Sequence, residues 1–191
     1  MDIVFATHNS NKLKEVQQIL PKHINLLSLD DINCHEEIIE TADSIEGNAL
    51  IKANHVFKNY NYPCFADDTG LFVDALNGEP GVYSARYAGP QKNAEDNNNK
   101  LLERLKNIKN RAAHFKTVIA YKTADQEKIF TGICPGTIIT SPEGHHGFGY
   151  DPLFKPQHYE DTFATLDPQI KNKISHRALS IQKFLEHLKN K

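Results

Sequence analysis

The chain has 191 residues, a length that fits one domain and suffices to bury a hydrophobic core without disulfides or metals. With 22 Lys and Arg against 24 Asp and Glu, its net charge of -2 excludes a general attraction to nucleic acid or to an anionic membrane. We therefore expect one domain over residues 1–191, no nucleic-acid or membrane partner, and only local sites for anions.

The three cysteines, Cys34, Cys64 and Cys134, are odd in number, far apart, and form no CxxC pair. This spacing disfavours a disulfide framework and a zinc site, and it is typical of reduced cysteines. The sequence has no apolar run of roughly 18 residues that would span a membrane, and no signal segment follows Met1. We expect a cytoplasmic protein.

The N-terminal third is predicted to alternate strands and helices. Apolar runs predict strands over residues 2–6 and 24–29, and apolar positions at helical spacing predict a helix over 12–20. Asp43, with Glu46 three positions later, is typical of the capped start of a helix, which we expect to end near residue 60.

The rest of the chain continues this mixture. A strand over residues 63–66 is predicted to run into the polar tetrapeptide DDTG, after which a strand or turn resumes. Glycines and prolines predict a loop over 78–90. The remaining predicted elements are a helix over 94–108, strands over 115–122 and 128–140, a glycine loop, and one final helix with apolar positions from 174 to 188. This mixture indicates an α/β or α+β class.

The first candidate site is the loop ATHNSNK, which leaves a predicted strand and enters a helix. Backbone N–H groups and the helix dipole attract anions at such a place, and Thr7, Asn9 and Lys12 add donors and a positive charge. The loop is therefore a candidate phosphate cradle, although the GxxxxGK[ST] and GxGxxG spacings are absent. The alternative is that Asn9 or Ser10 only caps the helix and Lys12 is solvated.

The second candidate site is FADDTG, with Asp67 and Asp68 at a predicted strand end. Consecutive strand residues point to opposite faces, so we expect one carboxylate to face a pocket and the other to bind turn amides. The carboxylate that faces the pocket could hold Mg²⁺, with Glu40 as a second carboxylate. The alternative is an Asx-turn that closes a hairpin.

The third candidate site is the loop HHGFGYDPLF. Gly147 and Gly149 permit a close approach of the backbone, Phe148 offers a ring face, and Asp151 offers an acceptor, so a flat heterocycle would fit. The alternative is a glycine-rich turn with Phe148 in the core.

The segment KNKISHR places Lys171, Lys173, His176 and Arg177 around the predicted start of the final helix. These side chains suit a phosphate or a purine carbonyl. The alternative, an exposed basic terminus, conflicts with the helix dipole, whose positive end disfavours cations unless an anion binds there.

Six segments in one order resemble those of the non-canonical purine nucleoside triphosphate pyrophosphatases, also called inosine or xanthosine triphosphate pyrophosphatases. They are ATHNSNK, ETADSIEGNALIKA, FADDTGL, GEPGVYSARYAG, GFGYDPLF and KNKISHR. The resemblance implies Mg²⁺-dependent hydrolysis of ITP, dITP and XTP to the monophosphate and pyrophosphate, which keeps deaminated purines out of DNA and RNA. It also implies an α/β fold with a long central mixed sheet and flanking helices that form two lobes around an active-site cleft, and a homodimer.

The resemblance also implies the site residues by matching position. Asp68 would be the general base and a Mg²⁺ ligand, with Glu40 as a second acidic group near the metal. The loop after the first strand would cradle the triphosphate, and the glycine loop would line the base pocket. The implied substrate-binding residues are Thr7, His8, Asn9, Ser10, Asn11, Lys12, Lys52, Thr69, Phe148, Gly149, Tyr150, Asp151, Lys171, His176 and Arg177.

The chain departs from this pattern at two places. His8 stands where many relatives have glycine, and Pro168 and Gln169 stand where relatives commonly have a more acidic stretch. Three other functions remain open from the residues: a nucleotide phosphatase that releases orthophosphate, a pyrophosphatase of pyrimidine or modified nucleotides, and a nucleotide-binding regulator without catalysis.

Overall fold

A computed structural model describes residues 1–190 of the chain. The helices are α1 (Ser10–Ile19), α2 (Ile45–Tyr60), α3 (Ala94–Arg104), α4 (Pro168–Ile174) and α5 (His176–Lys189), with short 3-10 helices η1 (Asp30–Ile32), η2 (Asp74–Leu76) and η3 (Ser84–Arg86). The strands are β1 (Asp2–Phe5), β2 (Asn25–Leu27), β3 (Cys64–Val73), β4 (Pro80–Gly81), β5 (Ala112–Lys122), β6 (Glu127–Ile138) and β7 (Phe154–Pro156). The predicted α/β class is confirmed.

Over the described residues, seven strands form one sheet in the order β2-β1-β3-β5-β6-β7, with β4 paired to β3. β1 runs parallel to β2 and β3, whereas β4 and β7 run antiparallel to β3 and β6. The sheet is therefore mixed, as predicted. Phe5 pairs with Phe65, so the chain leaves β1 beside the segment of β3 that continues to Asp67.

The chain divides into two compact units, which are described separately below. Unit 1 comprises residues 1–68, 117–132 and the chain from 177 onward, and unit 2 comprises residues 69–116 and 133–176. The long strands β3, β5 and β6 contribute residues to both.

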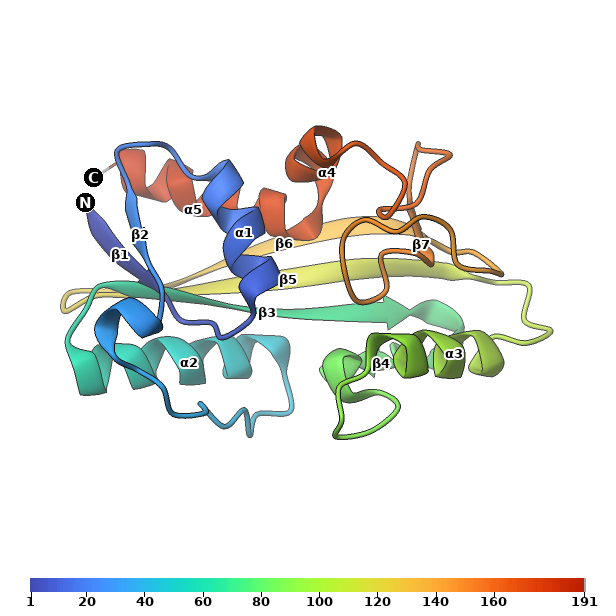
Figure 1. The fold of residues 1–191 in the computed structure, drawn as a ribbon, viewed down its shortest axis with the longest axis horizontal. Coiled ribbons are helices and arrows are strands. Elements are labelled where there is room, and N and C mark those ends of the chain that lie inside the picture. Colours follow the sequence, from blue (N-terminus) through green and yellow to red (C-terminus); the bar gives the residue numbers. More distant parts are fainter. Residues whose placement is uncertain (191) are drawn as a thin grey trace. The chain divides into compact units, whose positions relative to one another are not determined.

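Unit 1 has helices on both faces of its strands, with α1 and α5 on one face and α2 on the other (Figure 1). Under α1 and α5, the Phe65 ring lies 4.6 Å from that of Phe5 and 5.1 Å from that of Phe184, between ring centroids. The α2 stripe includes Ala49, Ala53 and other residues at helical spacing, and it is buried as the sequence predicts.

Unit 2 is built around a separate aromatic core. The Phe115 ring lies 4.7 Å from that of Phe154 and 6.1 Å from that of Phe163, between centroids. Leu101 of α3 and the nearby Leu105 are fully buried against this core. The core holds in place the loops that carry the predicted base pocket.

Two predicted boundaries of helices differ in the structure. α2 is capped by Ser44, whose Oγ accepts a hydrogen bond from Gly47 N at 3.1 Å, and not by Asp43. α3 ends at Arg104 instead of residue 108, because the backbone leaves helical geometry at Leu105, which has a φ of -93° and a ψ of 5°. Asn107 then adopts a left-handed φ of 64°.

The predicted single final helix is wrong, since the structure has two helices there. Asp167 caps α4 by accepting from Gln169 N at 2.7 Å, and the extended backbone of Ser175 separates α4 from α5. Lys171 and Lys173 lie in the last turn of α4, where the helix dipole favours cations. The predicted conflict with the dipole therefore does not exist for the two lysines.

All three cysteines are buried free thiols, in agreement with the prediction of reduced cysteines. In the part of the chain that the structure describes, no helix combines the length and hydrophobicity needed to cross a membrane.

Candidate active site

Asp67 and Asp68 lie in the middle of a strand. β3 runs without interruption from Cys64 to Val73, so the predicted strand end and the alternative of an Asx-turn are both wrong. These turn-prone residues stay extended because cationic and amide side chains of other elements bind their carboxylates. As neighbours in a strand, the two carboxylates point to opposite faces, and each has its own set of partners.

Asp67 faces α1 and α5, where it binds two cations. Its Oδ1 lies 2.9 Å from Lys12 Nζ, and its Oδ2 accepts from Arg177 Nε at 3.0 Å. Asp67 is 1% exposed, Arg177 is 2% exposed, and Arg177 also donates to Glu15. Burial alone would raise the pKa of Asp67, but the charges of Lys12 and Arg177 outweigh burial and hold that pKa well below its usual range. A carboxylate held this firmly as an anion is a poor general base.

Asp68 faces α2, where Asn48 and Lys52 lie four positions apart and so share one face of the helix. Asn48 Nδ2 donates to Asp68 Oδ2 at 3.3 Å, and Lys52 Nζ lies 3.7 Å from Asp68 Oδ1 and 2.5 Å from Glu40 Oε1. Burial raises the pKa of Asp68, although Lys52 and Lys12 oppose it. The pKa values of the two neighbouring aspartates are thus pushed apart, which is how paired carboxylates acquire different roles.

The loop between β1 and α1 is positioned by its helix cap. Asn9 Oδ1 accepts from Asn11 N at 3.0 Å and from Lys12 N at 3.2 Å, and Thr7 Oγ1 accepts from Asn9 N at 3.2 Å. The capping alternative is therefore confirmed for Asn9. The alternative of a solvated Lys12 is wrong, because its side chain is 13% exposed and pairs with Asp67.

The tip of the same loop, residues 8–11, is exposed. His8 Nε2 donates to the backbone carbonyl of Glu36 at 3.0 Å, so this side chain ties the loop to the segment before α2. Exposed polar side chains at the N-terminus of a helix are the arrangement expected of an anion site.

The glycine loop of unit 2 is organised by Asp151. Asp151 Oδ2 accepts from Phe148 N at 2.8 Å and from Lys171 Nζ at 2.7 Å. Gly147 has a φ of 77°, and a Cβ there would lie 2.1 Å from Asp151 Oδ2, so only glycine fits. Lys171 Nζ lies 5.4 Å from the centroid of the Phe148 ring, which is half-buried and not in the core. Three residues predicted for the base pocket thus lie together.

Other predicted residues of unit 2 have different surroundings. The His176 ring stacks on Phe115 with centroids 4.5 Å apart, and His176 is 4% exposed. Tyr150 is 5% exposed and its OH donates to Ser84 O at 2.8 Å, which makes this side chain part of the core. Thr69 is half-buried in β3, next to Asp68.

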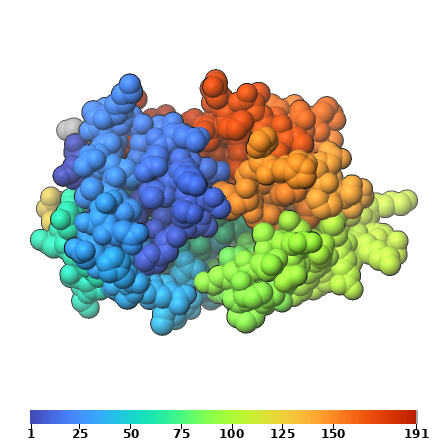
Figure 2. Space-filling model, viewed as in Figure 1, coloured from blue at the N-terminus to red at the C-terminus, as the bar shows by residue number. Residues whose placement is uncertain are grey.

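Three contacts of the site were not predicted from sequence. Asn48 binds Asp68, Glu15 binds Arg177, and Asn98 Nδ2 donates to Gly149 O at 3.1 Å. The space-filling view shows the glycine loop (orange) at the surface beside the green segment to which α3 belongs (Figure 2). The sequence could have indicated Asn48, since it and Lys52 are polar residues four positions apart beside the apolar stripe of α2. No sequence pattern indicates Glu15 or Asn98.

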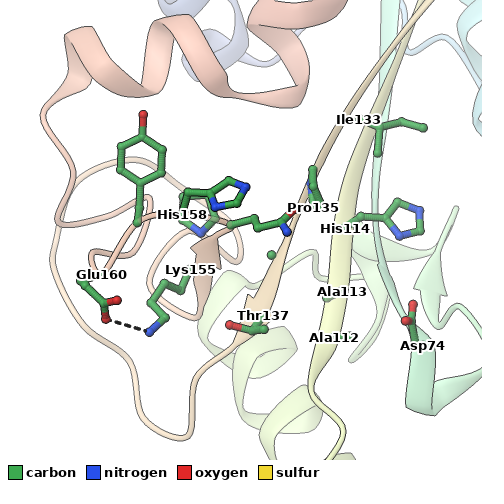
Figure 3. Close-up of a pocket in the computed structure, with 14 residues that line it drawn as sticks. Asp74, Ala112, Ala113, His114, Ile133, Pro135, Thr137, Lys155, His158 and Glu160 are labelled. Carbon is green, nitrogen blue, oxygen red and sulfur yellow. Dashed lines mark hydrogen bonds and ion pairs between the residues drawn. The ribbon is translucent and has the colours of Figure 1, made fainter.

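A groove with a volume of about 770 Å³ occurs elsewhere in unit 2 (Figure 3). His114, Ile133 and Pro135 surround it, and the Lys155–Glu160 ion pair, at 3.3 Å, stands at its edge. Within residues 1–190, its lining contains none of the residues predicted for the active site. The groove is therefore a separate surface feature.

Comparison with known proteins identifies the family. The Ham1 family model matches residues 3–187. A protein named dITP/XTP pyrophosphatase from Flavobacterium johnsoniae is 58% identical over 98% of both chains, and another of that name from Bacillus subtilis is 44% identical over 96% of this chain and 94% of its own.

The solved structure of a HAM1 protein from Coxiella burnetii covers 100% of both chains with 38% identity and a TM-score of 0.92. The Staphylococcus aureus Ham1 protein has a TM-score of 0.91 at 38% identity, covering 100% of this chain and 99% of its own. The predicted family resemblance is confirmed, and the chain belongs to the Ham1 family.

Proposed function

We propose that this chain hydrolyses deaminated purine nucleoside triphosphates, namely dITP, XTP and ITP, to the nucleoside monophosphate and pyrophosphate. The observation that carries the proposal is the Asp68–Lys52–Glu40 cluster, in which Asp68 and Lys52 are buried and the Glu40 side chain is 30% exposed, in a chain 58% identical to a protein named dITP/XTP pyrophosphatase. Removal of these nucleotides keeps them out of DNA and RNA.

The residues of unit 1 fit a divalent metal ion, which we propose to be Mg²⁺. Asp68 and Glu40 supply carboxylate oxygens, the ligands that Mg²⁺ prefers, and both lie against the same ammonium group of Lys52. A cation is thus already accommodated between the two carboxylates. When bound, the metal would neutralise part of the negative charge of the triphosphate and activate a water molecule.

In the proposed reaction, Asp68 accepts a proton from a water molecule whose oxygen attacks the α-phosphorus. A bond forms between this oxygen and the α-phosphorus, and the bond from the α-phosphorus to the bridging oxygen breaks, so that pyrophosphate leaves. Lys12 and Lys52 offset the negative charge that grows on the leaving group. The exposed loop of residues 7–12 holds the phosphates through its N–H groups and polar side chains.

For unit 2 we propose recognition of the base. Phe148 stacks on the purine, and Asp151 with Lys171 provides hydrogen bonds to its edge, while Gly149 allows the backbone to approach. The contacts among Asp151, Phe148 and Lys171 support this assignment because they arrange the loop before any ligand binds.

The reaction products test the proposed function directly. Purified protein is incubated with ITP and Mg²⁺, with ATP and GTP in parallel and EDTA as a control, and the products are separated by chromatography. We expect IMP and pyrophosphate, formed from ITP far faster than the products from ATP or GTP, and no reaction in EDTA. IDP with orthophosphate would instead support a phosphatase, and tight ITP binding without turnover would support a regulator.

Selectivity for a 6-keto purine needs a donor where adenine would present its own amino donor. We propose His176 for this role, because the Arg177 guanidinium is engaged by Asp67 and Glu15. His176→Phe keeps the stacking on Phe115 but removes the donor. We expect the ratio of kcat/KM for ITP over ATP to fall by about 10- to 100-fold, as for the loss of roughly 1–3 kcal/mol.

His114→Phe is the matched control for this variant. His114 also stacks on a phenylalanine, Phe72, with centroids 5.2 Å apart, but it lines the groove of Figure 3. The control should keep the wild-type ratio. An unchanged ratio in His176→Phe would remove His176 from the selectivity mechanism and leave a backbone N–H group as the candidate donor.

We further propose that the protein is a cytoplasmic homodimer with a single domain over residues 1–191 and that it binds no nucleic acid. The net charge of -2 supports the absence of a nucleic-acid partner. Light scattering of the purified protein tests the oligomeric state.

A further inference from the structure

Unit 1 contains a cluster of three potential metal ligands that takes no part in the proposed reaction. Cys34 and Glu36 lie in the segment after η1, and His55 lies on α2. One potential ligand atom from each, namely the thiol sulfur, a carboxylate oxygen and a ring nitrogen, all lie within 4.8 Å of one another. We define these three residues as the Cys34 cluster.

The dimensions of the Cys34 cluster are close to those of a tetrahedral metal site. Bonds of about 2.0–2.3 Å to nitrogen, oxygen and sulfur place the ligand atoms of a zinc site roughly 3.3–3.8 Å apart. Within the cluster, His55 Nε2 lies 2.8 Å from Glu36 Oε1, and the largest separation is below 4.8 Å. Small side-chain rotations therefore suffice to place a metal ion among the three atoms.

The cluster is partly open to solvent. Cys34 is fully buried, whereas the side chains of His55 and Glu36 are 25% and 46% exposed. A metal ion can reach the cluster from the side of Glu36, while the thiol stays protected from solvent.

Neighbouring residues hold two of the ligands in place. Tyr60 OH lies 2.8 Å and 2.9 Å from the two carboxylate oxygens of Glu36. The Asn59 side-chain amide lies 3.2 Å from His55 Nδ1, the ring nitrogen that would not bind the metal. Outer partners of this kind orient the ligands of metal sites and tune their affinity.

We propose that Cys34, Glu36 and His55 form a binding site for a divalent transition metal of the zinc class, with one coordination position left for water. A thiolate and an imidazole select such a metal over Mg²⁺, which takes oxygen ligands. Binding releases the thiol proton and replaces the hydrogen bond between His55 and Glu36. The spacing of the cysteines disfavours a zinc site, because they form no CxxC pair. The fold nevertheless brings His55 of α2 close to Cys34, which the cysteine spacing does not show.

The site would connect two parts of unit 1. The metal links the segment of Cys34 and Glu36 to α2, and the Glu36 carbonyl accepts a hydrogen bond from His8 of the proposed phosphate loop. Bound metal should therefore raise the melting temperature of the protein, because a ligand that binds only the folded state stabilises it.

Cobalt provides the test, since a thiolate bound to Co²⁺ gives a charge-transfer absorption band in the near ultraviolet. Purified full-length protein is stripped with a chelator and titrated with Co²⁺ in excess Mg²⁺, so that sites made of oxygen ligands are occupied. We expect one Co²⁺ per chain with the thiolate band, and loss of the band when Zn²⁺ is added, because zinc binds such sites more tightly.

Variants assign the band to the cluster. Cys34→Ser should abolish it, whereas Cys64→Ser and Cys134→Ser, which alter the other two buried thiols, should keep it. Tyr60→Phe leaves all three ligands in place and should weaken binding on the order of 10- to 100-fold. His55→Gln should weaken it more, with His23→Gln as an exposed control.

Absence of the band in the wild type, or its persistence in Cys34→Ser, would overturn the proposal. Unchanged affinity in His55→Gln would do the same. Circular dichroism of each metal-free variant separates lost binding from lost folding.

Discussion

Asp68→Asn should lower kcat for ITP hydrolysis by about 10²- to 10⁴-fold, the usual contribution of a general base. Asparagine has nearly the same shape and can still contact Asn48, but it cannot accept a proton from water. We expect KM to change much less, because the proposed phosphate loop and base loop are untouched. Steady-state kinetics of IMP release at saturating Mg²⁺ measure both constants.

Asp74→Asn is the control for this variant. Asp74 is an exposed aspartate directly after the same strand, and its substitution should leave turnover unchanged. A Mg²⁺ titration of Asp68→Asn separates the two proposed roles, since added metal would restore turnover only if metal binding were the limiting defect. Turnover like that of the wild type would contradict both roles of Asp68.

Elements with strong local signals could be predicted from the sequence. The run of apolar residues in β1 is fully buried at Ile3, Val4 and Phe5, as the pattern indicates. The apolar stripe of α2 likewise identified the helix and its end at Tyr60. In both cases the apolar residues of the element itself are enough to predict it, and no residue distant in sequence is needed.

The centre of β3 could not be predicted because its explanation lies elsewhere in the chain. The residues Asp67, Asp68, Thr69 and Gly70 have the composition of a turn, yet the strand continues through them. Burial of the two carboxylates depends on Lys12, Lys52 and Arg177, which come from three different helices. Local propensity says nothing about such compensation.

The sequence contains local features of the two C-terminal helices, but these features alone do not show that the helices are separate. Asp167 followed by Pro168 is typical of a helix start, and α4 does begin there. The signal at Ser175 is weaker: serine is favoured at N-caps, but the apolar spacing from residue 174 to 188 runs across it and predicts one continuous helix. The break puts Lys171 on one helix and Arg177 on another, where they bind Asp151 and Asp67.

Asp67→Asn should lower the free energy of unfolding by about 3–5 kcal/mol, the usual effect of removing one partner from a buried ion pair. The substitution leaves the charges of Lys12 and Arg177 buried beside a neutral amide, while Glu15 still binds Arg177. Urea denaturation in the presence of EDTA measures this change without a contribution from metal binding. Glu127→Gln, in the more exposed Lys122–Glu127 pair, should cost less than about 1 kcal/mol.

The same ion pairs predict how stability depends on pH. The pKa of Asp67 in the folded protein lies below the ordinary value of 3.8 for an unfolded aspartate, because Lys12 and Arg177 overcome the effect of burial. Its stabilisation is therefore complete above that value and is lost as the pH falls from 3.8 through the lower pKa of the folded state. Asp67→Asn should lack this part of the acid dependence, so the difference in unfolding free energy between wild type and variant should shrink in acid. A difference that stayed constant down to the acid transition would show that the variant perturbs packing and not the ionic interaction.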